Sequence, residues 1–199
     1  MQKEEILQAA IQQFLRLGIK SVSMDDISSL LGISKKTLYQ FVENKEDLVT
    51  QALWSFRNVE RQFIENISRN AHDAIDEMIQ IGRHHVSIVI NMSPSMNFDL
   101  KKYYPAVWKI VKEFNNEVVG QTILQNLEKG IKEGLYRKNV NPQIVEKLFR
   151  IKSWSIVDRT NFPIEEFRQD ELVREHLLYH LYGILSEKGK ERIKTYELF

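Results

Sequence analysis

Four helix starts lie within the first 50 residues of this 199-residue chain. The first helix is expected at 3–17, where apolar residues recur at helical spacing and Gly18 follows as a stop signal. Three later residues stand where a side-chain oxygen can cap the free amides of a following helix. They are Ser23, Ser34 and Asn44. Short helices that start so close together favour a small, tightly packed helical domain over a long bundle.

The rest of the chain also has a helical pattern, because prolines and glycines are few and no stretch alternates with period two. Ser34 predicts a third helix of about eight residues. Breakers and caps predict further helices at 44–70, 73–92, 99–104, 105–134, 142–158 and 170–187. Gly189 is expected to end the last helix and to leave a charged tail. The predicted fold class is all-α, with an N-terminal three-helix helix-turn-helix domain and a C-terminal helical domain.

Several function classes are disfavoured by what the sequence lacks. Cysteine is absent, which excludes disulfides, cysteine metal sites and thiol nucleophiles. No nucleophile elbow, phosphate-binding loop or HExxH pattern occurs, so no cofactor and no catalytic residue are predicted. An enzyme with a helical body stays an alternative that turnover of a substrate would support. No long apolar run and no signal-peptide core are present, so a cytoplasmic protein without a membrane partner is expected.

Residues 23–41 have the form of a helix-turn-helix, with Gly32 in the turn where a left-handed conformation is needed. Apolar residues of the two helices are predicted to pack against the first helix. The expected contacts join Ile27, Leu30, Ile33 and Leu38 to Leu7, Ala10 and Phe14. No acidic residue lies between Gly32 and Val42, and the outward side chains of the third helix are cationic or can form hydrogen bonds. They are Lys35, Lys36, Thr37, Tyr39 and Gln40.

Such a helix can enter the DNA major groove, where amide and ammonium groups read base edges and hydroxyls reach phosphates. Lys45 opens the fourth helix, and its ammonium together with the free amides would suit a phosphate. The first 50 residues hold six basic and seven acidic residues, so this prediction depends on where the charges lie. The alternative is a hairpin with a solvated polar face in a protein that interacts with other proteins and not with DNA.

The stretch from Ser23 to Tyr39, followed by Asn44-Lys45-Glu46-Asp47-Leu48, resembles the DNA-binding domain of the TetR (tetracycline-repressor) family. The resemblance covers about the first 50 residues. It implies a DNA-binding domain at 1–48 and a helical ligand-binding and dimerisation domain at 49–199. It also implies the DNA-contacting residues, in the major groove or near phosphates: Ser23, Met24, Ser34, Lys35, Lys36, Thr37, Tyr39, Gln40 and Lys45. The family often has His or Tyr followed by Phe where this chain has Phe41-Val42, so Phe41 offers no hydroxyl or imidazole to a phosphate.

By that resemblance, the expected function is a transcriptional regulator that a small-molecule effector releases from a palindromic operator. Its expected partners are double-stranded operator DNA, a second copy of the chain and the effector. Repression is the family's default, although the residues themselves do not separate a repressor from an activator. The last two long helices are apolar enough to form a dimer interface, with core packing within one chain as the alternative. The interface residues are predicted as Leu148, Ile151, Leu177, Leu178, Leu181, Tyr182 and Leu185.

An effector pocket is expected among the middle helices, where methionine and aromatic residues suit a partly apolar ligand. The candidate lining residues are Met78, His85, Val89, Met92, Phe98, Tyr104, Trp108 and Trp154. The alternative is that these residues belong to the core. His176 and His180 have the spacing of a two-histidine metal site on one helix face, but no third ligand is clearly placed beside them. No metal is therefore predicted.

Overall fold

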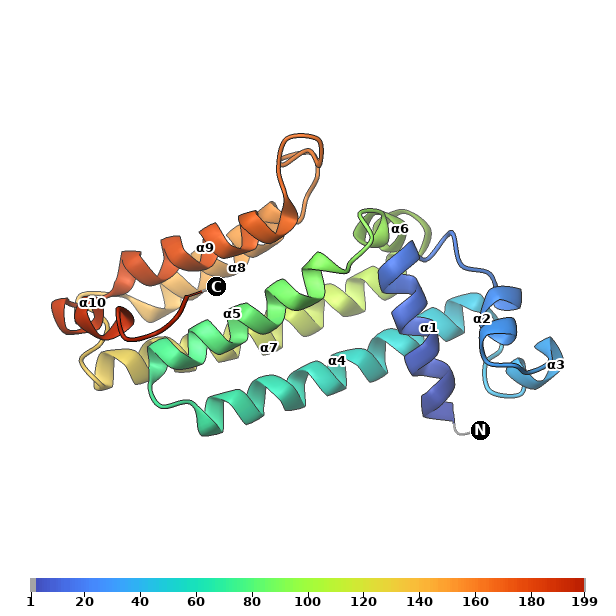
Figure 1. Cartoon of the computed structure of the whole chain (residues 1–199), viewed down its shortest axis with the longest axis horizontal. Helices are drawn as coiled ribbons and strands as arrows, with labels where there is room; N and C mark the ends of the chain where they lie inside the picture. Colours follow the sequence, from blue (N-terminus) through green and yellow to red (C-terminus); the bar gives the residue numbers. More distant parts are fainter. Residues whose placement is uncertain (1–2, 199) are drawn as a thin grey trace. The chain divides into compact units, whose positions relative to one another are not determined.

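The structure is a computed structural model that describes residues 3–198, and these residues form ten helices (Figure 1). The all-α prediction is confirmed. Within the described range the one extended pairing is an isolated bridge between Tyr136 and Leu185. The helices are α1 (Lys3–Leu17), α2 (Met24–Leu30), α3 (Lys35–Leu38), α4 (Lys45–Asn70), α5 (Ala74–Ile90), α6 (Met96–Tyr103), α7 (Pro105–Lys132), α8 (Pro142–Ile156), α9 (Gln169–Ile184) and α10 (Glu187–Ile193).

Helix α3 is shorter than the eight residues predicted for it. It ends at Leu38, and the chain then tightens into turns in which the N–H of Gln40 bonds to the carbonyl of Thr37 at 3.1 Å. The N–H of Phe41 likewise bonds to the carbonyl of Leu38 at 3.0 Å. These i to i+3 bonds are typical of a helix end that winds more tightly before it stops.

The prediction for the C-terminal end of the chain was also wrong. Helix α9 ends at Ile184, and α10 replaces the expected charged tail. The side chain of Ser186 caps this extra helix by accepting the N–H of Gly189 at 3.1 Å. Gly189 lies inside α10, at a position where a β-carbon would collide with the backbone carbonyl oxygen of Leu135. The glycine therefore permits a close approach and is not a helix stop.

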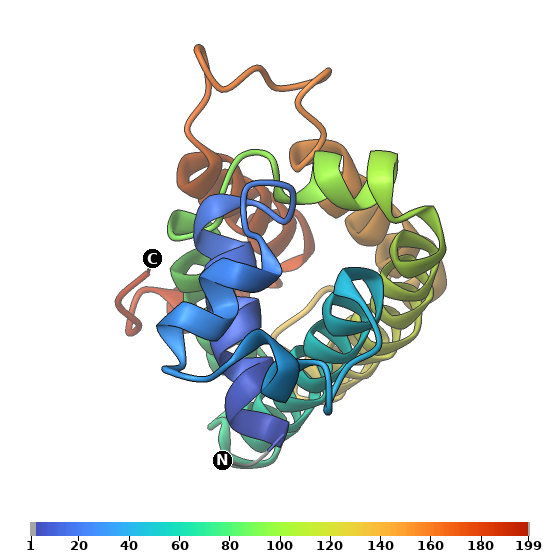
Figure 2. The same ribbon diagram turned by 90° about the vertical axis from the view of Figure 1, so that its right-hand side faces the viewer.

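The chain divides into two compact units, and the first contains residues 1–62 and 91–114. Its core forms around α1, α2, α3 and the start of α4, with Ile6, Phe14, Ile27, Leu38 and Leu48 fully buried. Figures 1 and 2 both show α2 and α3 next to each other, in agreement with their contacts.

One predicted core residue of this unit, Leu30, is instead 55% exposed. The inward stripe of α2 runs through Met24, Ile27 and Leu31, which are separated by three and four residues. Leu30 falls outside this stripe, because Leu31 and not Leu30 occupies the inward-facing position at the end of α2.

The second unit contains residues 63–90 and 115–199, where α9 packs against both α5 and α8. Tyr136 is fully buried in this unit, and its hydroxyl donates to the carbonyl of Ala74 at 3.0 Å or to Asn126 Oδ1 at 2.9 Å. Asn126 also donates to the carbonyl of Ala74, at 2.8 Å. Burial raises the pKa of Tyr136 well above its usual range. This network connects the start of α5 to α7 and to the loop that follows it.

These two units do not follow the predicted domain boundary between residues 48 and 49. Helix α4 begins in the first unit and continues into the second after residue 62. The division into 1–48 and 49–199 thus remains a prediction about function. None of the described helices combines the length and the apolar character that crossing a membrane requires.

Candidate nucleic-acid interface

The helix-turn-helix starts with a complete capping box at Ser23. The hydroxyl oxygen of Ser23 accepts the N–H of Asp26 at 3.1 Å, and the carboxylate of Asp26 accepts the N–H of Ser23 at 2.7 Å. The hydroxyl of Ser23 also donates to the carboxylate of Asp26 at 2.7 Å, and this bond, together with the one from the Ser23 N–H, holds the pKa of Asp26 below its ordinary value. The cap fixes the first turn of α2 by interactions within four residues, which is why the sequence pattern could predict it.

The turn between α2 and α3 depends on Gly32, which has φ +64°. The N–H of Gly32 bonds to Ser29 and the N–H of Ile33 to Ser28, at 3.1 and 3.0 Å. A β-carbon at Gly32 would meet no atom within 4 Å. The need for glycine here therefore comes from the backbone angle and not from crowding.

Helix α3 presents its polar side chains outward because Leu38 anchors it in the core. Leu38 is fully buried, and Ser34 caps the helix by accepting the N–H of Thr37 at 3.0 Å. Thr37 is half-buried. The exposed members of the predicted DNA-contacting set around this helix are Ser34, Lys35, Lys36, Tyr39 and Gln40. The structure thus brings the predicted base-reading side chains together on one short, anchored helix and the turn that follows it.

This surface has an acidic neighbour on α2 that the sequence pattern did not predict. Asp25 of α2 forms an ion pair with Lys35 at 2.9 Å, and this contact raises the pKa of Lys35. Both side chains are at least half exposed, so the pair contributes little to stability. It does hold the Lys35 ammonium beside α2, where a DNA phosphate would have to compete for it.

Lys45 and Met24 lie differently from the exposed residues of α3. Lys45 is half-buried at the start of α4, and burial lowers its pKa against the opposing influence of Asp99 and Asp26. The Met24 side chain is 7% exposed and belongs to the core of the first unit. Any contact of Met24 with a phosphate would therefore use its backbone N–H at the start of α2.

The predicted dimer residues divide into two groups. Leu177, Leu181 and Leu185 are buried in the core of their own chain, where α9 packs on α5 and α8. Their side chains are therefore core and not surface. Leu178 is half-buried. The exposed apolar residues of α8 and α9, which we call the α8–α9 face, are Ile144, Leu148, Ile151, Tyr179 and Tyr182.

The sequence had no means of separating these groups, since α9 is apolar around most of its circumference. Two members of the α8–α9 face, Ile144 and Tyr179, were not in the predicted set. The ammonium of Lys152 on α8 lies 4.0 Å from the ring centroid of Tyr179 on α9. The two helices therefore present a continuous outer surface to solvent.

The predicted effector-pocket residues divide between the two units. Met78 and Val89 are buried in the core of the second unit, where His85 is exposed and Trp154 is half-buried. The other four belong to the first unit. Of these, Met92, Tyr104 and Trp108 pack against its core, and Phe98 is 55% exposed. The proposed lining stays a prediction.

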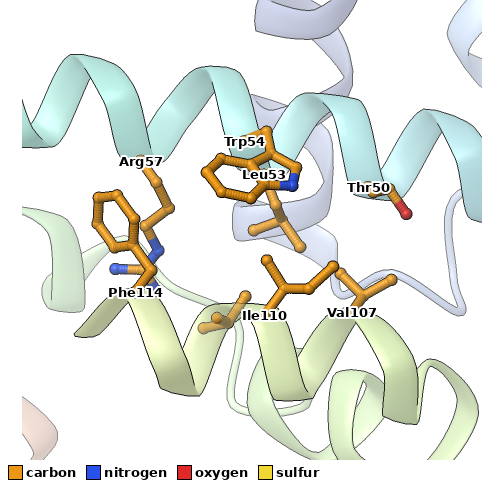
Figure 3. A pocket seen from close by; sticks show the side chains of 8 residues that line it. Thr50, Leu53, Trp54, Arg57, Val107, Ile110 and Phe114 are labelled. Carbon is orange, nitrogen blue, oxygen red and sulfur yellow. The ribbon is translucent and has the colours of Figure 1, made fainter. Parts of the chain in front are cut away.

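A small pocket that the sequence did not suggest lies in the first unit between α4 and α7 (Figure 3). Its cavity volume is about 10 Å³, which is close to the least that one water molecule needs. It is lined by Thr50, Leu53, Trp54, Arg57, Val107, Ile110, Val111 and Phe114. The lining is almost entirely apolar apart from one arginine.

The two histidines with metal-like spacing are buried against Phe149. The ring nitrogen Nε2 of His176 lies 3.0 Å from the hydroxyl of Ser153, and the ring centroid lies 4.5 Å from that of Phe149. Burial lowers the pKa of His176 to about 4 and that of His180 to about 3. Among the described residues no group of three His, Asp or Glu side chains is placed to hold a metal ion. The site is best described as aromatic packing around neutral histidines.

Comparison with known proteins gives consistent results for the N-terminal region and for the fold. Residues 6–52 match the family described as bacterial regulatory proteins, tetR family. The chain is 26% identical to the HTH-type transcriptional regulator YvaF of Bacillus subtilis, over 84% of this chain and 88% of that protein. It is 22% identical to the HTH-type transcriptional repressor KstR2 of Mycolicibacterium smegmatis, over 94% and 92% of the two chains.

Solved structures extend the similarity to the whole fold. The crystal structure of a transcriptional regulator from Cytophaga hutchinsonii superposes with a TM-score of 0.73 at 20% identity, over 92% of this chain and 98% of that one. FadR of Bacillus subtilis, solved in complex with stearoyl-CoA, superposes with a TM-score of 0.66 at 17% identity, over 92% and 100%. At these identities the likeness concerns the fold.

Proposed function

Because this chain belongs to the TetR family of DNA-binding transcriptional regulators, we propose that it is a repressor that binds a palindromic operator as a homodimer. The observation that carries the proposal is the row of polar side chains on α3 and in the turn after it, which contains no acidic residue and is held by the Ser34 cap and the buried Leu38. Lys35, Lys36 and Gln40 have the chemistry that reads base edges in the major groove. The domain at 1–48 would supply this contact.

A second copy is proposed because one short helix contacts too few base pairs for useful specificity. Dimeric helix-turn-helix proteins read two half-sites about 34 Å apart, or a multiple of that distance. The α8–α9 face supports this part of the proposal, since five large apolar side chains are exposed there. Surfaces of this kind on a folded chain often mark an interface with another protein. The remainder of the chain, 49–199, would then carry dimerisation and effector binding.

Release by a small molecule is the third part of the proposal. The transcriptional regulator FadR of Bacillus subtilis, which has a similar fold, was solved with stearoyl-CoA, and KstR2 of Mycolicibacterium smegmatis is described as a repressor. In this chain, α4 begins beside the DNA-reading helix and continues to Asn70. A ligand that favours a shifted position of α4 would change the separation of the two recognition helices and weaken operator binding.

The test is selection of bound fragments from random double-stranded DNA, combined with a measurement of mass in solution. The proposal predicts a palindromic consensus and a dimer. Binding that depends only on salt and not on sequence would contradict the operator, and a monomer bound to a single half-site would contradict the dimer. A selected operator then allows effector screening by loss of the DNA complex.

A further inference from the structure

Two half-buried arginines on α4 each carry one buried nitrogen that lacks a hydrogen-bond partner. The Nε atoms of Arg57 and Arg61 are both buried, and neither has a partner among the residues that the structure describes. The residues are four apart and thus one helical turn apart, so their like charges oppose each other. Leaving a charged donor buried without a partner costs free energy.

Both guanidinium groups lie over the ring of Phe114 on α7. The central guanidinium carbons lie 5.9 Å (Arg57) and 4.9 Å (Arg61) from the ring centroid. Burial lowers the pKa of Arg57 to about 10, and the nearby Glu60 opposes this shift only in part. The ring offers these cations a weak attraction, but it offers their N–H groups no oxygen.

The apolar pocket between α4 and α7 adjoins this pair. Arg57 is itself part of the lining, and Figure 3 shows it reaching from α4 toward α7 beside Phe114. The Trp54 ring meets the Phe114 ring edge to face, with centroids 6.4 Å apart. Trp54 remains 44% exposed at the edge of the pocket. A cationic end and an apolar interior therefore occur side by side.

We propose that the effector is an anionic amphiphile whose carboxylate or phosphate binds Arg57 and Arg61 and whose apolar tail enters the pocket between α4 and α7. The proposal rests on the proposed effector-controlled function and names its ligand class. An anion would supply the acceptors that the two Nε atoms lack, in the planar geometry that guanidinium groups favour. The cavity of about 10 Å³ holds no such tail, so binding must separate α4 from α7.

This separation explains how the ligand would act on DNA. Thr50 and Leu53 line the pocket, and they lie five and eight residues after Lys45, the first residue of α4. A rigid helix transmits a displacement at these positions to its own start. The tail would therefore move the end of α4 that follows the DNA-reading helix.

The experiment compares three probes with the same ten-carbon tail: decanoate, decyl phosphate and decanol. Each is titrated calorimetrically into the full-length protein below its micellar concentration. The proposal predicts that at least one anion binds about tenfold or more tightly than decanol, as expected for charge-assisted hydrogen bonds. Decanoate alone, decyl phosphate alone or both would identify a carboxylate, a phosphate or either group as the preferred head.

Variants locate the site. R57M should abolish the preference for the anion, and R61M should reduce it several-fold, whereas R57K should keep part of it. The matched control is R69M, because Arg69 lies on the same helix with its side chain 72% exposed and paired with Glu65. Thermal melts establish that each variant is folded. If R57M does not fold, R61M and R57K still show whether the preference for an anion depends on these arginines.

Three results would overturn the proposal: equal affinity for decanol and both anions, no binding of any probe, or an anion preference that R57M and R61M leave intact. A mobility shift on the selected operator, run with the same protein samples, separates this failure from failure of the proposed function. Operator binding without probe binding would reject the ligand class and keep the DNA-binding regulator. If a probe binds but does not release the operator, the ligand site between α4 and α7 stands and its proposed effect on DNA binding is wrong.

Discussion

The proposed DNA-reading segment at 23–45 and the α8–α9 face expose opposite chemistry on the same chain. The segment presents groups such as Lys36 and Gln40, whereas the face presents groups such as Ile151 and Tyr179. Contacts with phosphates weaken steeply as salt rises, but apolar association is almost indifferent to it. The difference teaches that DNA binding and dimerisation can be separated experimentally, because salt weakens DNA binding and has little effect on apolar association.

The largest expected effect comes from placing a charge on the α8–α9 face. Ile151 is 63% exposed on α8, and I151E should convert the dimer into a monomer because a carboxylate would be buried without a partner at the interface. Affinity for a palindromic operator should fall more than about 100-fold, since the second half-site is lost. Sedimentation and a mobility shift measure the two effects.

Q143E is the matched control, because Gln143 is an exposed polar residue on the same helix. It should leave both the mass and the operator affinity unchanged. If I151E remains a dimer, Ile151 does not lie in the dimer interface, and the proposed role of the α8–α9 face in dimerisation is wrong.

The next effect concerns base reading by α3. Q40A removes an exposed amide and should relax the preference at one base position by roughly 5- to 150-fold, which corresponds to 1–3 kcal/mol for a good bidentate contact. Binding to unrelated sequences should change little. The measurement is selection of operator variants with the wild-type protein and with Q40A, and an equal loss at every position would show that Gln40 serves only the backbone of the DNA.

Acid should affect the two units differently, because all five histidines lie in the second unit. His176 and His180 have folded-state pKa values of about 4 and 3, below the unfolded value of about 6.5. The unfolded chain therefore binds more protons as pH falls below 6.5, and stability falls with pH until it reaches the folded pKa values. Each histidine should cost up to about 2 kcal/mol by pH 5.

Urea unfolding at pH 7 and pH 5 tests this expectation. H180L should remove about half of the loss, and H72Q should remove none, because His72 is exposed. An identical acid response of the wild type and H180L would mean that the buried histidines do not control acid stability.

A smaller effect is expected from the phosphate contact proposed for Lys45. K45A should weaken binding to all DNA sequences alike and reduce the salt dependence of log K by about 1. Titrations of operator and random DNA at several salt concentrations provide the measurement. A loss confined to the operator would contradict the division between Lys45 and Gln40.

The smallest effect should come from the ion pair that α2 contributes to the recognition surface. D25N releases Lys35 from its partner at 2.9 Å and removes a negative charge near the DNA. Binding should tighten a few-fold at low salt, in line with the modest value of exposed pairs, and the gain should shrink as salt rises. Weaker binding by D25N would show that the pair positions Lys35 for the DNA.

What the sequence determined by itself was local. The Ser23 and Ser34 caps, the left-handed Gly32 and the outward residues of α3 follow from interactions among residues at most a few positions apart. The type and approximate position of most helices follow from the same short-range rules. The helix-turn-helix could therefore be recognised from the sequence alone, whereas the DNA contacts of its individual residues stay a prediction.

Tertiary structure decided which apolar or charged side chain is covered. Leu177 and Leu181 became core whereas Tyr179 stayed on the surface, Gly189 became part of α10, and the Nε atom of Arg57 became buried without a hydrogen-bond partner. Each outcome depends on what another helix places against the residue, often more than 40 positions away in the chain. Helical spacing shows which residues share a face, but it carries no information on what packs against that face.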